Sequence, residues 1–340
     1  MASRREARVM ASRREARVMA SRRNARVMVT RQEVRRMAMS AVRNWFGRHV
    51  VHPAADVEAP RPLPRLEPTV AAAEELPPVR ARPPPSWTPD RLATTDALWG
   101  EGYQFPGGEI ETLRLAKPLG LSAASSLLLI GAGGGGPSCA LATQLGVWVS
   151  GFESDPNLVA AAEDRIARRN LTKRAQMETW NPAAPHFREH FYHHGLALEP
   201  LRGSPPERTL SAIAAALKPA GHLMMLEVVA DKALDPANKV VAAWARLERR
   251  DPKTLPSEIT ITRILGRLGF DVRVAEDISE RHIHQALLGW RTTVRGMENV
   301  RPSRREAMRH VEEAELWMLR LRLFQMGWLR LVRWHAIGRG

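Results

Sequence analysis

Apolar and amphipathic segments alternate along most of the chain after residue 88. Short apolar runs predict strands at 126–130, 147–152 and 222–229, and two further strands are expected at 175–179 and 271–275. Apolar positions three or four residues apart predict helices at 109–119, 137–145, 157–169, 209–217 and 257–268. Strands that alternate with helices build a mostly parallel sheet covered on both faces. The pattern therefore predicts a doubly wound α/β domain.

The C-terminal region predicts one long helix followed by a strand. Ser303 and Glu306 form a capping box, and apolar residues then recur at helical spacing to about Met326. Residues 329–337 alternate apolar and polar side chains, which is typical of an edge strand. The mixture of Arg, Trp and Met here fits a docked helix with a basic solvent face better than a helix on a membrane surface.

The N-terminal region differs from the rest of the chain in being repetitive and rich in Arg and then Pro. Methionines recur every nine residues from Met1 to Met37, in Arg-rich units that are too short for a solenoid and too polar to order themselves. We expect residues 1–52 to form a disordered basic tail, unless translation starts at a later Met. Eleven of the 25 prolines lie in 53–89, which predicts an extended linker. The folded domain is then 90–340, including the C-terminal helix and edge strand.

Charge and cysteine content narrow the picture. The formal net charge is +15, but the first 50 residues carry +11 of it (fourteen Arg, three Glu, no Lys), so contact with nucleic acid or an acidic surface is expected only through the tail. The single cysteine, Cys139, excludes an internal disulfide. No apolar run reaches the roughly 18 residues of a membrane span. We expect a cytoplasmic protein, and the oligomeric state stays open.

A glycine turn carries the strongest functional signal. The apolar run 127–130 leads into Gly131-Ala132-Gly133-Gly134-Gly135-Gly136, and Glu153 follows about 20 residues later at the end of the next strand. Glycines admit a close ligand, a helix start offers free N–H groups, and an acid at this distance suits a ribose diol. The pattern predicts a nucleoside-cofactor site. A tight turn without a ligand, or a dinucleotide site of the G-x-G-x-x-G type, would show the same residues.

Further motifs resemble one family. The segment Ala216-Leu217-Lys218-Pro219-Ala220-Gly221-His222-Leu223 is similar to the L-K-P-G-G-x-L turn of class I, Rossmann-like S-adenosylmethionine-dependent methyltransferases. Gly100-Glu101-Gly102-Tyr103 and Pro106-Gly107-Gly108 resemble the loop ahead of the first strand in small-molecule enzymes of the phosphoethanolamine and sarcosine type. The resemblance covers roughly residues 95–275. It implies a seven-stranded sheet, S-adenosylmethionine as cofactor and a small-molecule methyl acceptor.

Carried over to this chain, the resemblance implies a set of cofactor-binding residues. Tyr103 and Gly107 would flank the methionine end, the glycines would line the turn, Glu153 would bind the ribose and Asn181 would face the adenine. The full set is Tyr103, Gly107, Gly131, Gly133, Gly135, Glu153 and Asn181.

Three positions depart from the family pattern. Leu129 stands two residues before the first glycine, where an acid is usual; Asn181 replaces an Asp; Thr95 stands where a tyrosine is found in the phosphoethanolamine type. These departures keep two alternatives open. One is a protein that binds S-adenosylmethionine with little or no catalysis, and the other is an NAD-dependent oxidoreductase.

Histidines provide candidate catalytic groups. His186, His190, His193 and His194 lie within nine positions, and a histidine suits proton removal from an amine or hydroxyl. We take His193 and His194 as the candidate bases. A structural role is the competing interpretation, and a metal site is disfavoured because no matching second ligand pair has a familiar spacing. We expect the acceptor pocket between the loop 99–108, residues 190–198 and the C-terminal helix.

Overall fold

The computed structural model describes residues 87–299 and 302–340, with the side chains of 298 and 299 excepted. The basic tail and nearly all of the proline-rich linker lie outside these residues. The first described element is helix α2 (Pro89–Trp99), which begins where Thr88 caps the backbone N–H of Arg91. Thr88-Pro89-Asp90 is a sequence typical of a helix start, with a capping hydroxyl followed by Pro at the first helical position.

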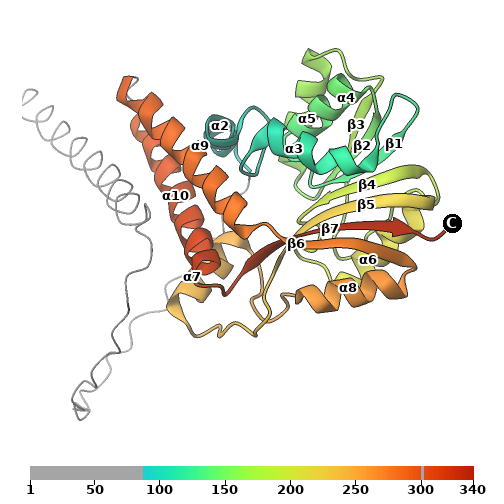
Figure 1. Cartoon of the computed structure of the whole chain (residues 1–340). Helices are drawn as coiled ribbons and strands as arrows, with labels where there is room; N and C mark the ends of the chain where they lie inside the picture. The colour runs from blue at the N-terminus through green and yellow to red at the C-terminus, as the bar shows by residue number, and fades with distance from the viewer. Residues whose placement is uncertain (1–86, 300–301) are drawn as a thin grey trace, which may run out of the picture. The chain divides into compact units, whose positions relative to one another are not determined.

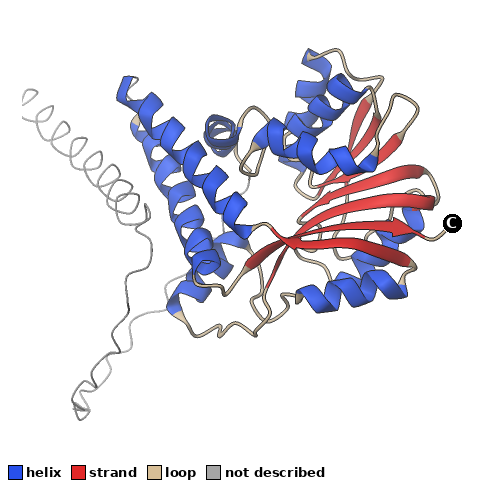
Figure 2. Ribbon diagram, in the orientation of Figure 1, coloured by secondary structure: helices blue, strands red, loops and turns tan. Residues whose placement is uncertain are grey.

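The described residues form one seven-stranded sheet with the order β3-β2-β1-β4-β5-β7-β6 (Figure 2). The first five strands run parallel, and β7 pairs antiparallel with both β5 and β6. The strands are β1 (Ser126–Ile130), β2 (Trp148–Glu153), β3 (Ala175–Thr179), β4 (Tyr192–Leu198), β5 (Leu217–Val229), β6 (Phe270–Asp277) and β7 (Arg330–Gly338). The mostly parallel, seven-stranded sheet is confirmed.

Helices cover both faces of this sheet (Figure 1). One layer contains α3 (Gly108–Ala116), α4 (Gly136–Leu145) and α5 (Pro156–Arg168), and the other contains α6 (Pro206–Ala216) and α8 (Glu258–Arg267). A short 3₁₀ helix, η1 (Lys117–Leu119), follows α3. The doubly wound arrangement follows from strands that are apolar on both sides: Leu127 to Ile130 of β1 are at most 1% exposed.

A second group of helices packs together beside the sheet. It consists of α2, α7 (Lys239–Glu248), α9 (Ser279–Asn299) and α10 (Arg304–Gln325). Trp99 of α2 contacts Trp290 of α9 and Trp317 of α10, with ring centroids 6.4 and 4.8 Å apart. The sequence predicts α10 and its capping box but neither α7 nor α9. Within the described ranges, no helix is long and apolar enough to cross a membrane.

Strand β7 is not the edge strand that its alternating pattern predicts. It lies between β5 and β6, and β6 forms the edge. Trp334 on β7 is fully buried against the apolar core, and its Nε1 donates to Thr262 Oγ1 at 3.0 Å. The error arises because the alternation of side chains along a strand does not show whether one or two neighbouring strands pair with it.

The Lys218–Gly221 turn lies inside β5 as an irregularity. Tyr192 pairs with Leu217, but His194 pairs with His222, so the four residues between leave the ladder. Ala220 there has a positive φ of 58°.

The interior position of β7 yields a stability prediction. We expect Trp334→Ala to lower the free energy of unfolding by about 3–5 kcal/mol, because it opens a cavity between β7 and α8. Ile259→Ala, on the exposed side of α8, should change it by less than about 0.5 kcal/mol. Urea denaturation of both variants tests this, and comparable small losses would contradict the central placement of β7.

Candidate functional site

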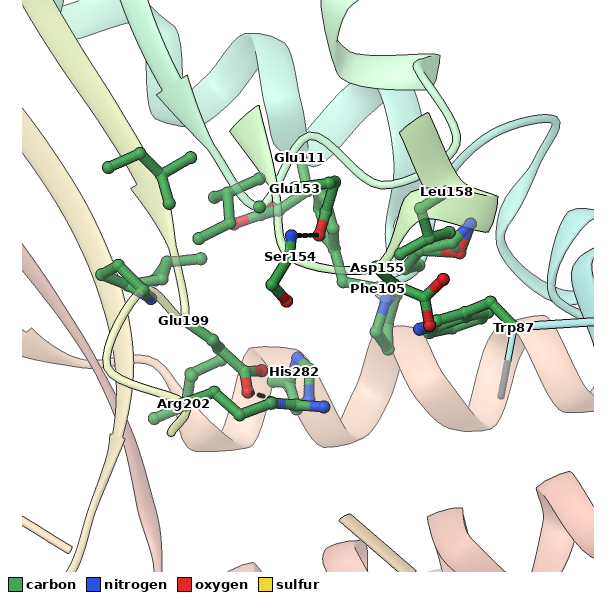
Figure 3. Close-up of a pocket in the computed structure, with 18 of the residues that line it drawn as sticks. Trp87, Phe105, Glu111, Glu153, Ser154, Asp155, Leu158, Glu199, Arg202 and His282 are labelled. Carbon is green, nitrogen blue, oxygen red and sulfur yellow. Dashed lines mark hydrogen bonds and ion pairs between the residues drawn. The ribbon is translucent and has the colours of Figure 1, made fainter. Parts of the chain in front are cut away.

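A pocket lies at the carboxyl ends of the parallel strands, where α/β sheets bind ligands. With its open mouth included, the space within it is about 1030 Å³. Figure 3 shows Glu153 and Ser154 on one wall, with Glu199, Arg202 and His282 across from them. The pocket therefore has one wall from the ends of β1 and β2 and another from β4 and α9.

The glycine turn and Glu153 build the first wall. A Cβ on Gly131 would lie 2.2 Å from the Leu198 carbonyl oxygen, so only glycine fits there. The Glu153 carboxylate accepts hydrogen bonds from the N–H groups of Gly133 at 2.6 Å and Ser154 at 3.3 Å. Burial raises the pKa of Glu153 to about 7, and these N–H groups only partly offset the effect. The predicted turn and acid are thus brought together.

The loop 99–108 is clamped onto the glycine turn. Gly136 N–H donates to the Gly102 carbonyl at 3.1 Å. Arg165 of α5 is 6% exposed and donates to the Gly134 carbonyl. The same side chain lies 3.2 Å from carboxylate oxygens of Asp96 and of Glu101, and Asp96 accepts from the N–H of Gly102 at 2.7 Å. One buried arginine therefore ties α2, the loop and the turn together.

Gln104 is a polar residue of the pocket that the sequence interpretation missed. Its side chain lies against Gly133 and Gly134, and it lines the pocket. Both of its amide atoms, Nε2 and Oε1, are buried without a hydrogen-bond partner. Buried amides without partners are rare in native proteins, so this one fits a ligand that supplies both a donor and an acceptor.

The opposite wall rests on a buried network of charges. Glu199, directly after β4, contacts Arg250 at 2.5 Å, Arg202 at 2.9 Å and Arg320 of α10. Burial alone would raise the pKa of Glu199, but the three guanidinium groups hold it well below its usual range. Glu248 accepts from Arg320 at 2.8 Å and Glu227 from Arg250 at 2.8 Å. The network joins the end of β4 to β5, α7 and α10.

His282 stands next to this network on α9. The side chain lines the pocket, is 5% exposed and has no hydrogen-bond partner for Nε2. Burial, and after it the Arg320 guanidinium, lowers the pKa of His282 to about 3. The imidazole is therefore neutral at physiological pH, with a lone pair available to a ligand.

Several predicted cofactor residues support the pocket from outside it. Tyr103 is buried, and its ring packs against Gly136. A Cβ at that glycine would lie only 2.8 Å from the ring. Gly107 caps α3 beside Gln285, and Gly135 packs against Ala162 of α5. Asn181 is exposed, its side-chain oxygen accepts from the Ala183 N–H at 3.0 Å, and Trp180 lines the pocket instead. Only Gly131 and Glu153 of the predicted set line the pocket directly.

The structure places His193 and His194 away from this pocket, whose lining includes neither, so their role as bases stays a prediction without support from the pocket. Both lie at the amino end of β4, roughly 13–16 Å along the strand from Leu198. His193 Nδ1 accepts from the Ser126 N–H at 3.0 Å, and His194 Nδ1 accepts from the His222 N–H at 3.2 Å. The structural interpretation of these histidines fits better. No group of three or more His, Cys, Asp or Glu among the described side chains is arranged to hold a metal ion.

The sequence reveals site residues that share one continuous motif, but not those that separate helices and loops bring together in the fold. Gly131 and Glu153 belong to one continuous motif, so their spacing reveals them. Arg165, Gln104 and His282 come from separate elements, and no spacing links them. A lone histidine in an unpredicted helix carries no mark that it faces a pocket.

Sequence and structure comparisons place these features among known proteins. No family model matches the chain. It is 27% identical to the 27-O-demethylrifamycin SV methyltransferase of Amycolatopsis mediterranei over 65% of this chain and 82% of that protein. It is 25% identical to methyltransferase GfsG of Streptomyces halstedii, over 51% of this chain and 63% of that protein.

Among solved structures, the phosphoethanolamine N-methyltransferase 2 of Haemonchus contortus aligns with a TM-score of 0.64 and 17% identity. The alignment covers 74% of this chain but only 58% of that enzyme. By fold, the chain is therefore similar to class I, Rossmann-like S-adenosylmethionine-dependent methyltransferases, and its sequence is similar to two curated methyltransferases. Over the shared region, its fold resembles that of the phosphoethanolamine enzyme.

The Arg165 clamp generates a prediction for the site. Arg165→Ala should lower the free energy of unfolding by about 3–5 kcal/mol, because it leaves the Gly134 carbonyl and Asp96 without their buried partner. Arg168→Ala is the matched control: it removes an exposed arginine of the same helix, also paired with Glu101, and should cost less than about 1 kcal/mol. Denaturant titrations compare the two, and equal losses would show that the clamp adds nothing beyond a surface ion pair.

Proposed function

We propose that the chain transfers a methyl group from S-adenosylmethionine to a small-molecule acceptor. The observation that carries this proposal is the pocket itself, in which the glycine turn and Glu153 face a second wall of different chemistry. The similarity to curated small-molecule methyltransferases supports it. The chain covers only 63% of methyltransferase GfsG and 58% of the phosphoethanolamine enzyme. What those proteins methylate is therefore not carried over, and the acceptor of this chain is part of the proposal.

The residues present fit the cofactor. The ribose diol suits the Glu153 carboxylate, and the methionine end, which carries both a carboxylate and an ammonium group, suits the unpartnered amide of Gln104. Gln104 offers polar contact near the turn where Leu129, fully buried in β1, offers none. When bound, the cofactor supplies a methyl group on an already activated sulfonium.

The side chains of the pocket then need to align the reactants and keep water out. Methyl transfer is an in-line displacement, so alignment and exclusion of water provide most of the acceleration. The clamped loop 99–108 contributes Phe105 and Pro106 to the pocket and shields the turn from solvent. Leu226, Ile278 and Leu331 form an apolar surface on the acceptor side.

A panel assay tests the activity. Incubation of the full chain with S-adenosylmethionine and alcohols, phenols, amines or carboxylates should release S-adenosylhomocysteine with at least one class. Tight cofactor binding without release would favour the inactive binding protein. A larger rise in melting temperature with NAD than with S-adenosylmethionine would favour the oxidoreductase.

The Glu153 carboxylate yields a pH prediction. Its pKa of about 7 lies above the usual value, so the group is neutral below that pH and loses acceptor capacity for the ribose hydroxyls. The affinity for S-adenosylhomocysteine should therefore fall as the pH drops from 8 to 6. Glu153→Gln should bind about 1–3 kcal/mol more weakly at pH 8 and depend less on pH.

Isothermal titration calorimetry at several pH values measures both effects. The Gln variant also serves as the control for titration of the ligand itself, since that contribution is common to both proteins. Unchanged affinity in the variant would defeat the assignment of Glu153.

A further inference from the structure

The imidazole of His282 is a buried polar group that faces the acceptor side of the pocket without a protein partner. Its Nε2 makes no hydrogen bond, although the residue is only 5% exposed. Buried polar atoms in native proteins are nearly always paired, and an exception calls for a missing partner. Figure 3 shows the side chain rising from α9 beside Glu199 and Arg202.

The ring is held in place by aromatic packing. Its centroid lies 5.7 Å from that of Trp317 and 5.6 Å from that of Phe324, both on α10. The Arg320 guanidinium, which belongs to the same helix, opposes protonation of the ring. The Nε2 atom of the neutral imidazole thus stands in a fixed position as a donor or an acceptor, according to the tautomer, and a hydroxyl group can pair with either.

The charged groups around His282 are already paired. Glu199 is shared by three arginines, and Glu111 of α3 lies 3.3 Å from Arg281 Nε and accepts from Gln285 at 2.9 Å. Arg202, the cationic side chain on the pocket's described lining, is held by Glu199 at 2.9 Å. This wall therefore has no unpaired charge for an ionic ligand, and Leu226, Ile278 and Leu331 make the rest of it apolar.

We propose that His282 binds the methyl acceptor through a hydroxyl group, and that the acceptor is an uncharged alcohol or phenol with an apolar body. The inference rests on the proposed function, because it names the substrate class of the same pocket. In the transfer, the acceptor oxygen forms the new bond to the methyl carbon as the carbon–sulfur bond breaks. The bonding electron pair goes to sulfur, and the hydroxyl proton leaves to solvent water, while the neutral imidazole holds the acceptor by a hydrogen bond and is not itself protonated.

Three matched probes test the substrate class: phenylpropanol, phenylpropylammonium and phenylpropionate. The full chain is saturated with S-adenosylhomocysteine, and binding of each probe is followed by NMR titration. The alcohol should bind at least several-fold more tightly than either ion. His282→Ala should weaken alcohol binding roughly 3- to 10-fold, as expected for one lost hydrogen bond, and leave the ions unaffected.

Two further variants separate the hydrogen bond from a loss of structure. His282→Gln places an amide near the position of Nε2 and should restore most of the alcohol affinity. His284→Ala removes an exposed histidine from the same helix and should change nothing. Unchanged binding of S-adenosylhomocysteine by each variant shows that the pocket remains folded.

The outcomes distinguish the two proposals. Failure of the unmodified chain to bind S-adenosylhomocysteine would defeat the proposed function. With the cofactor product bound normally, preference for an ion, binding of none of the probes, or unchanged alcohol affinity in His282→Ala would overturn the role of His282 alone.

Discussion

The packing of α7 and α10 beside the sheet depends on the ion pairs of the Glu199 carboxylate. Glu199 lies directly after β4 and joins the sheet to α7 and α10 through Arg250 and Arg320. Charges this deeply buried are tolerated only when each has partners, so the helices can dock in one arrangement alone. Glu199 has a positive φ of 50°, an unusual conformation for a residue with a side chain, and the surrounding ion pairs hold it there. The network fixes where α10 stands relative to the strands, and His282 of the pocket lining packs against Trp317 and Phe324 of that helix.

The two walls of the pocket are therefore stabilised by different kinds of interaction. The cofactor wall depends on backbone geometry: glycines that no Cβ could replace, and N–H groups that meet a carboxylate. The opposite wall, to which we assign the acceptor, depends on side chains from α9 and from the charge network beside it. Backbone geometry permits few sequences, whereas an apolar wall with one polar group accepts many. One fold can thus retain a cofactor site while its acceptor site varies.

This difference explains what could be predicted from the sequence. β1 matches its predicted bounds because a continuous apolar run before the glycine turn leaves one interpretation, and β3 matches its own through an alternation of buried and exposed residues. β7 was misplaced at the edge because its neighbours are set by the antiparallel return from α10, which its own residues do not encode. α9 was missed, and His282 with it. The predicted bases rest on four histidines that cluster in sequence, but His193 and His194 lie towards the end of β4 opposite to the one that lines the pocket.

Clustering along the chain and convergence in space are thus separate kinds of evidence. His193 and His194 are adjacent in sequence and already bonded to their neighbours at the start of β1 and within β5. Gln104 and His282 are 178 positions apart, yet both line the same pocket with polar atoms that lack partners. A satisfied polar group has little left to offer a ligand, whereas an unsatisfied buried one gains free energy from it. We therefore expect the unpaired amide of Gln104 and imidazole of His282, both in the pocket lining, to contact a ligand before the clustered histidines do.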